Sequence, residues 1–257
     1  MDNPLRAVWD RGETALNAWL NISHTFSAEI MAAQDFDALT VDCQHGPIDY
    51  SGLLPMFQAM RASGKTLMAR VPWRDPTWVM KFLDAGAMGI ICPMVNSAEE
   101  AEEFVSYLRY PPHGQRSWGP TRAMFATPGY NKDGANAAVL AFAMIETGKA
   151  LDNLEAIAKT PHLDALYVGP SDLSVGMSNG ALQPGLDREE PEVIEAIKRI
   201  VAIAHENGIR AALHCGTPEY AARGVEWGYD MVTISADSAI LAQGAANLTK
   251  TFRGLVG

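Results

Sequence analysis

The sequence predicts a (β/α)8 TIM barrel that takes up the whole chain, residues 1–257, as a single domain. Short apolar runs alternate eight times with longer segments of helical period, which is the pattern of a parallel α/β protein. A length of 257 residues is common for one such barrel. A doubly wound sheet is the competing architecture, but it favours a glycine-rich turn after the first strand, and residues 21–24 contain no glycine.

The predicted strands are short runs of apolar and β-branched residues: Ala15–Asn21, Ala38–Asp42, Thr66–Val71, Gly89–Cys92, Leu140–Glu146, Ala165–Val168, Ala211–His214 and Met231–Ser235. The predicted helices are the amphipathic segments between and after them: Ala28–Gln34, Gly52–Ala62, Pro76–Ala85, Ala98–Leu108, Leu151–Thr160, Pro191–Asn207, Glu219–Trp227 and Asp237–Phe252. Ser97 and Glu100 form a capping box at one helix start, and Gly208 marks the end of another. The long irregular segment 110–134 is expected to be a loop over the active site.

Composition narrows the class of protein. The chain has 20 Lys and Arg against 30 Asp and Glu, a net charge of -10 without a basic cluster, which argues against a nucleic-acid partner. Its three cysteines lie far apart, so we expect reduced thiols and a cytoplasmic protein. The charged N-terminal residues and the lack of a long apolar stretch argue against a signal peptide and a membrane span.

Catalytic groups of such a barrel lie where strands end. Glu146 ends the fifth predicted strand and Asp172 follows the sixth, so their carboxylates are candidate ligands of a divalent metal such as Mg²⁺, Mn²⁺ or Co²⁺. Such an ion stabilises the enolate of a 2-oxo acid as a Lewis acid. The structural alternative for both carboxylates is a capping or salt-bridging role.

Arg70 lies near the end of an otherwise apolar strand, where its guanidinium needs a carboxylate or an oxyanion. It is therefore a candidate substrate ligand, with a structural ion pair as the alternative. His45 is the candidate base, because it follows a strand end and imidazole titrates near neutral pH. Asp42 and Asp84 are the carboxylates that could raise its basicity, and His24 and His214 are weaker candidates for the pocket.

The predicted strands contain no interior lysine, whereas an aldolase that forms a Schiff base needs one. Metal–enolate chemistry therefore fits this sequence better than imine chemistry.

Five motifs together resemble the HpcH/HpaI aldolase family. The resemblance runs from Trp19 to about Gly244 and keeps the order and spacing of the motifs: Asp-Cys-Gln-His-Gly-Pro at 42–47, Ala-Arg-Val at 69–71, Leu-Asp-Ala-Gly-Ala at 83–87, Met-Ile-Glu-Thr at 144–147 and Gly-Pro-Ser-Asp-Leu-Ser at 169–174. It is similar above all to class II pyruvate aldolases of the 4-hydroxy-2-oxoheptanedioate and 2-keto-3-deoxy-sugar-acid type. The resemblance implies a barrel of the phosphoenolpyruvate/pyruvate type.

The resemblance also implies roles for individual residues. Glu146 and Asp172 would ligate the metal, and His45 would act as general acid and base with Asp84 raising its basicity. Arg70 would contact the keto oxygen of the substrate. The remaining implied contacts are the backbone N–H groups of Ser171 and Asp172 to the pyruvate carboxylate, and a pocket shaped by Trp19 and Leu213.

The resemblance further implies a homo-oligomer, a hexamer built as a trimer of dimers that exchange the last helix, Asp237–Phe252. Three positions depart from the family pattern. Many relatives carry Gln at the substrate-binding position of Met144, an acidic residue at Gln44 and smaller residues around Trp118. A bulky Trp118 near the mouth predicts a small or apolar acceptor.

The function expected from the sequence is the reversible retro-aldol cleavage of 4-hydroxy-2-oxo acids to pyruvate or hydroxypyruvate and an aldehyde, through an enolate held by the metal. Two alternatives stay open. One is a CoA-ester lyase of the citrate lyase β or malyl-CoA type, which favours a basic surface for the CoA phosphates. The other is a non-catalytic protein that binds a metal and a 2-oxo acid.

Overall fold

A computed structural model describes residues 1–257 and shows a closed barrel of eight parallel strands that pair in sequence order, with β8 next to β1. The predicted (β/α)8 barrel is thereby confirmed, and the doubly wound sheet is excluded. The strands are β1 (Ala15–Leu20), β2 (Ala38–Asp42), β3 (Thr66–Arg70), β4 (Gly89–Cys92), β5 (Leu140–Ile145), β6 (Ala165–Val168), β7 (Arg210–Cys215) and β8 (Met231–Ile234).

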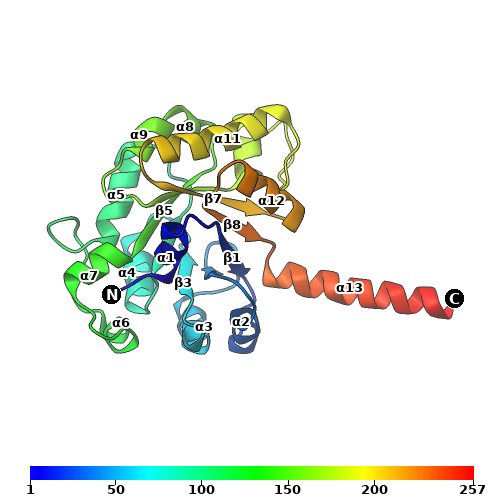
Figure 1. Ribbon diagram of the computed structural model, residues 1–257, viewed down its shortest axis with the longest axis horizontal. Coiled ribbons are helices and arrows are strands. Elements are labelled where there is room, and N and C mark those ends of the chain that lie inside the picture. The colour runs from blue at the N-terminus through cyan, green and yellow to red at the C-terminus, as the bar shows by residue number, and fades with distance from the viewer.

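Helices surround the barrel, and the last of them projects away from it (Figure 1). They are α1 (Pro4–Asp10), α2 (Thr25–Ala32), α3 (Tyr50–Met60), the 3-10 turn η1 (Arg61–Ser63), α4 (Pro76–Asp84), α5 (Ala98–Leu108), α6 (Thr121–Ala126), α7 (Lys132–Ala138), α8 (Gly148–Asp152), α9 (Leu154–Ala158), α10 (Pro170–Met177), α11 (Pro191–Glu206), α12 (Pro218–Glu226) and α13 (Asp237–Val256).

All eight predicted strands are present, with bounds that differ by one residue at most at either end. Four helices were not predicted: α1, α6, α7 and α10. They are short, so their sequences show little helical periodicity. The segment predicted as one helix over Leu151–Thr160 is two, α8 and α9, which meet at Asn153.

The N-terminal end of the barrel is closed by α1. The side chain of Asn3 caps this helix at the N–H of Leu5, and its amide donates to the carbonyls of Met88 and Ala138 beside the starts of β4 and β5. Leu5, Val8 and Trp9 of α1 are buried with side chains of the barrel interior. The interior is therefore accessible only from the opposite end, where the strands finish.

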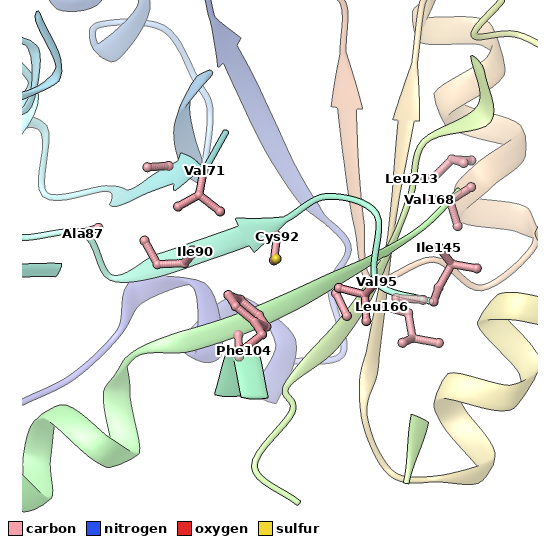
Figure 2. Close-up of a cluster of buried hydrophobic side chains, with 14 of the residues drawn as sticks. Val71, Ala87, Ile90, Cys92, Val95, Phe104, Ile145, Leu166, Val168 and Leu213 are labelled. Atoms are coloured by element: carbon pink, nitrogen blue, oxygen red, sulfur yellow. The ribbon is translucent and has the colours of Figure 1, made fainter. Parts of the chain in front are cut away.

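The main apolar core lies between the strands and the surrounding helices. Figure 2 shows a part of it, in which Val168 of β6 and Leu213 of β7 lie side by side. These outward-facing side chains alternate along each strand with inward-facing ones. Leu213 is fully buried, and a Cβ added to Gly224 of α12 would lie 3.0 Å from its side chain.

The segment 109–139 lies at the N-terminal end of the barrel, because it joins the end of α5 to the start of β5. Asn136 of this segment accepts from and donates to the backbone of Tyr110, and Arg61 donates to carbonyls of α6. The expectation of a loop over the active site of its own chain is therefore wrong. Trp118 is half-exposed beside Tyr110 and Tyr130 and does not lie at the pocket mouth.

None of the helices combines the length and apolar character that a membrane crossing requires. The long helix α13 nevertheless carries many exposed apolar side chains on the part that projects from the barrel: Ile240, Leu241, Leu248, Phe252, Leu255 and Val256.

A buried ion-pair cluster at the N-terminal end of the barrel predicts a strong effect on stability. Asp164 accepts from Arg6 at 2.5 Å, from Arg109 at 2.7 Å and from the N–H of Ala141 at 2.8 Å. Asp164→Ala leaves the buried Arg109 without its anion and should lower the free energy of unfolding by about 3 kcal/mol in a urea titration. The matched control is Asp133→Ala, which removes an exposed pair with Lys132 and should cost less than about 1 kcal/mol. Equal losses in both variants would contradict this account.

Candidate active site

A pocket of about 230 Å³ opens at the carboxyl ends of the strands. Residues from seven of the eight strands, or from the segments that follow them, line it, and only β4 contributes none. They are Trp19, Asn21, His45, Arg70, Met144, Glu146, Gly169, Ser171, Asp172, Leu186, His214 and Ala236. The structure thus brings together most of the residues that the sequence singled out. A hollow of about 270 Å³ between α4 and α5 contains one charged side chain, Arg116, which is already paired with Asp84.

Arg70 and Asp42 form a bidentate ion pair at the pocket wall. The Nε and Nη2 atoms of Arg70 donate to the two carboxylate oxygens of Asp42, each at 2.8 Å. Burial alone would raise the pKa of Asp42, but the hydrogen bonds and charge of Arg70 outweigh it and lower that pKa. The pair is thus neutral overall and fixes the guanidinium, while Nη1 of Arg70 has no acceptor in the chain.

Glu146 lies deeper in the pocket, with 2% of its surface exposed. Its Oε1 accepts from the N–H of Met94 at 2.6 Å, and Met94 has a φ of 55°, which non-glycine residues seldom adopt. Burial, reinforced by the charge of Asp172, raises the pKa of Glu146 to about 7, although the Met94 hydrogen bond and Arg70 act in the opposite direction. No Lys or Arg forms a salt bridge with this carboxylate.

Asp172 is exposed in the first turn of α10, which begins directly after β6. No side chain caps this helix, and the backbone N–H groups of Ser171 and Asp172 have no acceptor in the chain. A helix N-terminus with free N–H groups attracts an anion. The geometry therefore fits the predicted carboxylate site, beside a carboxylate that itself has no cationic partner.

These contacts leave the pocket with uncompensated negative charge. Asp42 and Arg70 neutralise each other, whereas Glu146 and Asp172 face the same space without a cation. The residues fit a hard divalent ion, because two carboxylates supply oxygen ligands and the open pocket leaves positions for water and substrate. Gly169 belongs to this arrangement, since a Cβ there would lie 2.7 Å from Oε2 of Glu146. The chain offers no cluster of three metal-binding side chains.

His45 is exposed at the pocket rim, and its imidazole makes no hydrogen bond within the chain. The expectation that Asp42 holds this imidazole is wrong. Asp42 accepts instead from Arg70 and from the backbone N–H groups of Gln44 and His45. A carboxylate can hold only groups that reach it, and the guanidinium of the neighbouring strand is closer than the imidazole.

Asp84 does not reach the pocket of its own chain. It ends α4, which runs back along the barrel, so this residue lies at the end opposite to the strand ends. Its carboxylate accepts from Arg116 at 3.0 Å. The expectation that Asp84 raises the basicity of His45 is therefore wrong within one chain.

The expectation that the side chain of Leu213 shapes the pocket is also wrong. Leu213 packs in the apolar core between the strands and the helices (Figure 2). Because side chains alternate along β7, its neighbour His214 faces the pocket instead. Asn21, Leu186 and Ala236 are further lining residues that were not predicted. Asn21 follows β1 and Ala236 follows β8 closely, so their positions after strand ends could have identified them as pocket residues. Leu186 comes from the loop after α10, where no feature of the sequence indicates a pocket residue.

The fold and the pocket define this chain as a barrel protein with an acidic pocket at the strand ends. Comparison with known proteins narrows the class further. Residues 16–243 match the family model described as HpcH/HpaI aldolase/citrate lyase. The chain belongs to the HpcH/HpaI aldolase family.

Individual relatives cover almost the whole chain. The chain is 38% identical to a hydroxypyruvate/pyruvate aldolase of Rhizorhabdus wittichii, over 98% of this chain and 100% of that one. It is 31% identical to a 4-hydroxy-2-oxo-heptane-1,7-dioate aldolase of Escherichia coli, over 98% and 95% of the two chains. The crystal structure of a family member from Burkholderia cenocepacia superposes with a TM-score of 0.88 at 28% identity, over 97% of this chain and 98% of that one.

The raised pKa of Glu146 predicts a stability that depends on pH. Its pKa is about 7 in the folded protein against 4.5 ordinarily, so this group favours folding fully below pH 4.5 and loses that contribution as the pH rises through 7. In protein freed of metal, Glu146→Gln should raise the unfolding temperature by a few degrees at pH 8 and change it little at pH 5. Differential scanning calorimetry measures both. The same shift at the two pH values would contradict the assignment.

Proposed function

We propose that this protein is a divalent-metal-dependent aldolase, which reversibly cleaves 4-hydroxy-2-oxo acids into pyruvate or hydroxypyruvate and an aldehyde. The observation that carries the proposal is the pair of carboxylates, Glu146 and Asp172, which face the pocket without a cation. The names of two relatives, a hydroxypyruvate/pyruvate aldolase and a 4-hydroxy-2-oxo-heptane-1,7-dioate aldolase, support the same reaction class.

In this proposal Glu146 and Asp172 hold Mg²⁺, Mn²⁺ or Co²⁺. When bound, the ion supplies Lewis-acid stabilisation for the negative charge of an enolate. The free N–H groups of Ser171 and Asp172 bind the substrate carboxylate at the start of α10. Arg70, held rigidly by Asp42, directs its unpaired Nη1 at the keto oxygen.

His45 moves the proton. In the cleavage direction its imidazole takes the proton of the C4 hydroxyl, the C3–C4 bond breaks, and the same residue returns a proton to C3. The exposed position of His45 at the rim gives its imidazole access to the hydroxyl group on C4 and to C3. Met144 and Trp19 form apolar walls beside these groups.

The CoA-ester lyase alternative is less well supported. A CoA thioester brings phosphate groups, which favour clustered Lys and Arg near the pocket. Arg70 is the only Lys or Arg among the lining residues, and it is neutralised by Asp42. The family description itself covers both aldolases and citrate lyase, and the lining of the pocket supports the aldolase proposal.

Removal of metal gives the first test. Treatment with a chelator should abolish both retro-aldol cleavage and the decarboxylation of oxaloacetate, because both reactions pass through the enolate of pyruvate. Mg²⁺, Mn²⁺ or Co²⁺ should restore both activities in a coupled assay of pyruvate release. Full cleavage activity after chelation would refute the proposal.

Replacement of the base gives the second test and separates an enzyme from a binding protein. His45→Ala should lower kcat at least about 100-fold, since general acid–base catalysis contributes at least that much, while pyruvate affinity stays the same. Calorimetric binding of pyruvate in Mn²⁺ provides the control for an intact site. Unchanged turnover in this variant would leave His45 without a catalytic role.

We further propose that the protein is a homo-oligomer, a hexamer built as a trimer of dimers that exchange α13. The exposed apolar side chains of this projecting helix support a partner surface. The carboxylate of Asp84 could approach the imidazole of His45 only across an interface, from a second copy of the chain. The double variant Leu248→Glu, Phe252→Glu should therefore sediment as a smaller species than the wild type in analytical ultracentrifugation. A wild-type monomer would contradict this proposal.

A further inference from the structure

His214 has no role in the chemistry proposed above, yet it lines the same pocket. It lies at the inward-facing position near the end of β7, and it keeps a partly exposed edge although the strand around it is buried. Its Nδ1 lies 3.1 Å from the hydroxyl of Tyr167, which has no exposed surface. The imidazole edge that remains accessible is therefore the one that faces the pocket.

A chain of buried polar groups continues from Tyr167 into the barrel interior. The hydroxyl of Tyr167 lies 2.8 Å from that of Thr233, and the amide of Asn17 links Thr233 to Thr40. These side chains from β1, β2, β6 and β8 have no exposed surface. A buried polar network that is fully hydrogen bonded holds its members in one orientation. It therefore fixes the ring of His214 from behind.

The direction of these hydrogen bonds defines the tautomer of His214. The amide of Asn17 satisfies its neighbours when its nitrogen donates to Thr40 and its oxygen accepts from Thr233, each at 2.9 Å. Thr233 then accepts from the hydroxyl of Tyr167, and Tyr167 in turn accepts from Nδ1–H of His214. This leaves Nε2 of His214 with a lone pair directed at the pocket.

Two further features support an acceptor role. Burial, together with the charge of Arg70, lowers the pKa of His214 to about 4, so the imidazole stays neutral near pH 7. Asn21, another lining residue, has a buried side-chain oxygen without a donor in the chain. A buried acceptor without a donor is costly, and Nε2 of His214 is a further acceptor, at the pocket surface, that has no donor in the chain.

His214 also lies within reach of a small substrate. The guanidinium carbon of Arg70 is 4.8 Å from the ring centre of Trp19. The ring centre of His214 is 4.7 Å from the ring centre of the same indole. The neighbouring apolar walls, Leu186 and Ala236, provide no side-chain hydrogen bond. Arg70 and His214 thus pack against the same indole and line the same pocket, so a small molecule held by Arg70 lies close to His214.

We propose that His214 is a specificity-determining residue, which accepts a hydrogen bond from a hydroxyl group of the substrate. The inference rests on the proposed aldolase function and names the substrate class of that site: hydroxylated 2-oxo acids or hydroxylated aldehydes. The hydroxyl can belong to the donor, as in hydroxypyruvate, or to the acceptor, as in glycolaldehyde. The Tyr167 network positions the imidazole and does not touch the substrate.

The test compares pairs of substrates that differ by one hydroxyl group. The donor arm measures kcat/KM for hydroxypyruvate and pyruvate with propanal as the acceptor. The acceptor arm measures kcat/KM for glycolaldehyde and acetaldehyde with pyruvate as the donor. In the wild type the hydroxylated member of at least one pair should be favoured.

His214→Phe should reduce kcat/KM for that hydroxylated member about tenfold and leave its partner nearly unchanged, since one neutral hydrogen bond accounts for about this factor. His214→Gln, whose side-chain oxygen also accepts, should recover most of the loss. Tyr167→Phe should change the ratio in the same direction but less. If the ratio of kcat/KM for the hydroxylated substrate to that for its partner falls in the donor arm, the hydroxyl belongs to the donor. If it falls in the acceptor arm, the hydroxyl belongs to the aldehyde.

Unchanged ratios in both arms for His214→Phe would overturn the proposal. A variant that does not fold, judged by thermal unfolding, is replaced by His214→Leu. A wild type without turnover on any pair would instead sink the proposed function. In that case, the affinities for hydroxypyruvate and pyruvate are measured by calorimetry in Mn²⁺. A lower ratio of hydroxypyruvate to pyruvate affinity in His214→Phe than in the wild type supports the role of His214, and an unchanged ratio overturns it.

Discussion

The site depends on an electrostatic imbalance between two neighbouring strand ends. Asp42 holds Arg70 in a neutral pair, whereas Glu146 and Asp172 are left facing one small space. Two carboxylates that face the same pocket repel each other, and burial raises the pKa of the deeper one, Glu146. In the proposed function, a divalent cation held by both carboxylates would offset these two negative charges.

The barrel creates this imbalance through simple geometric rules. Parallel strands bring their carboxyl ends to one face, so that groups far apart in sequence meet. The backbone also positions the Glu146 carboxylate: Met94 donates its N–H to it, and Gly169, which lacks a side chain, leaves the space that it occupies. At the opposite end α1 closes the interior, which confines access to the side with the charges.

The sequence was sufficient for the barrel, for the strand positions and for the residues at strand ends, because these follow from hydrophobic period and chain order. It was insufficient for partners and for side-chain direction. Asp42 is three residues from His45 but is bound by Arg70 of the next strand. Leu213 and His214 are adjacent, and only the pleat of β7 decides which one faces the pocket. Asp84 was misplaced because a helix returns its end to the other face.

The most direct test of the central claim is the location of a metal ion in crystals of the protein grown with Mn²⁺ and pyruvate. Anomalous diffraction should show one strong peak per chain, bound by carboxylate oxygens of both Glu146 and Asp172 and by oxygens of pyruvate. A pocket without such a peak, or a peak bound elsewhere while pyruvate occupies the pocket, would contradict the account.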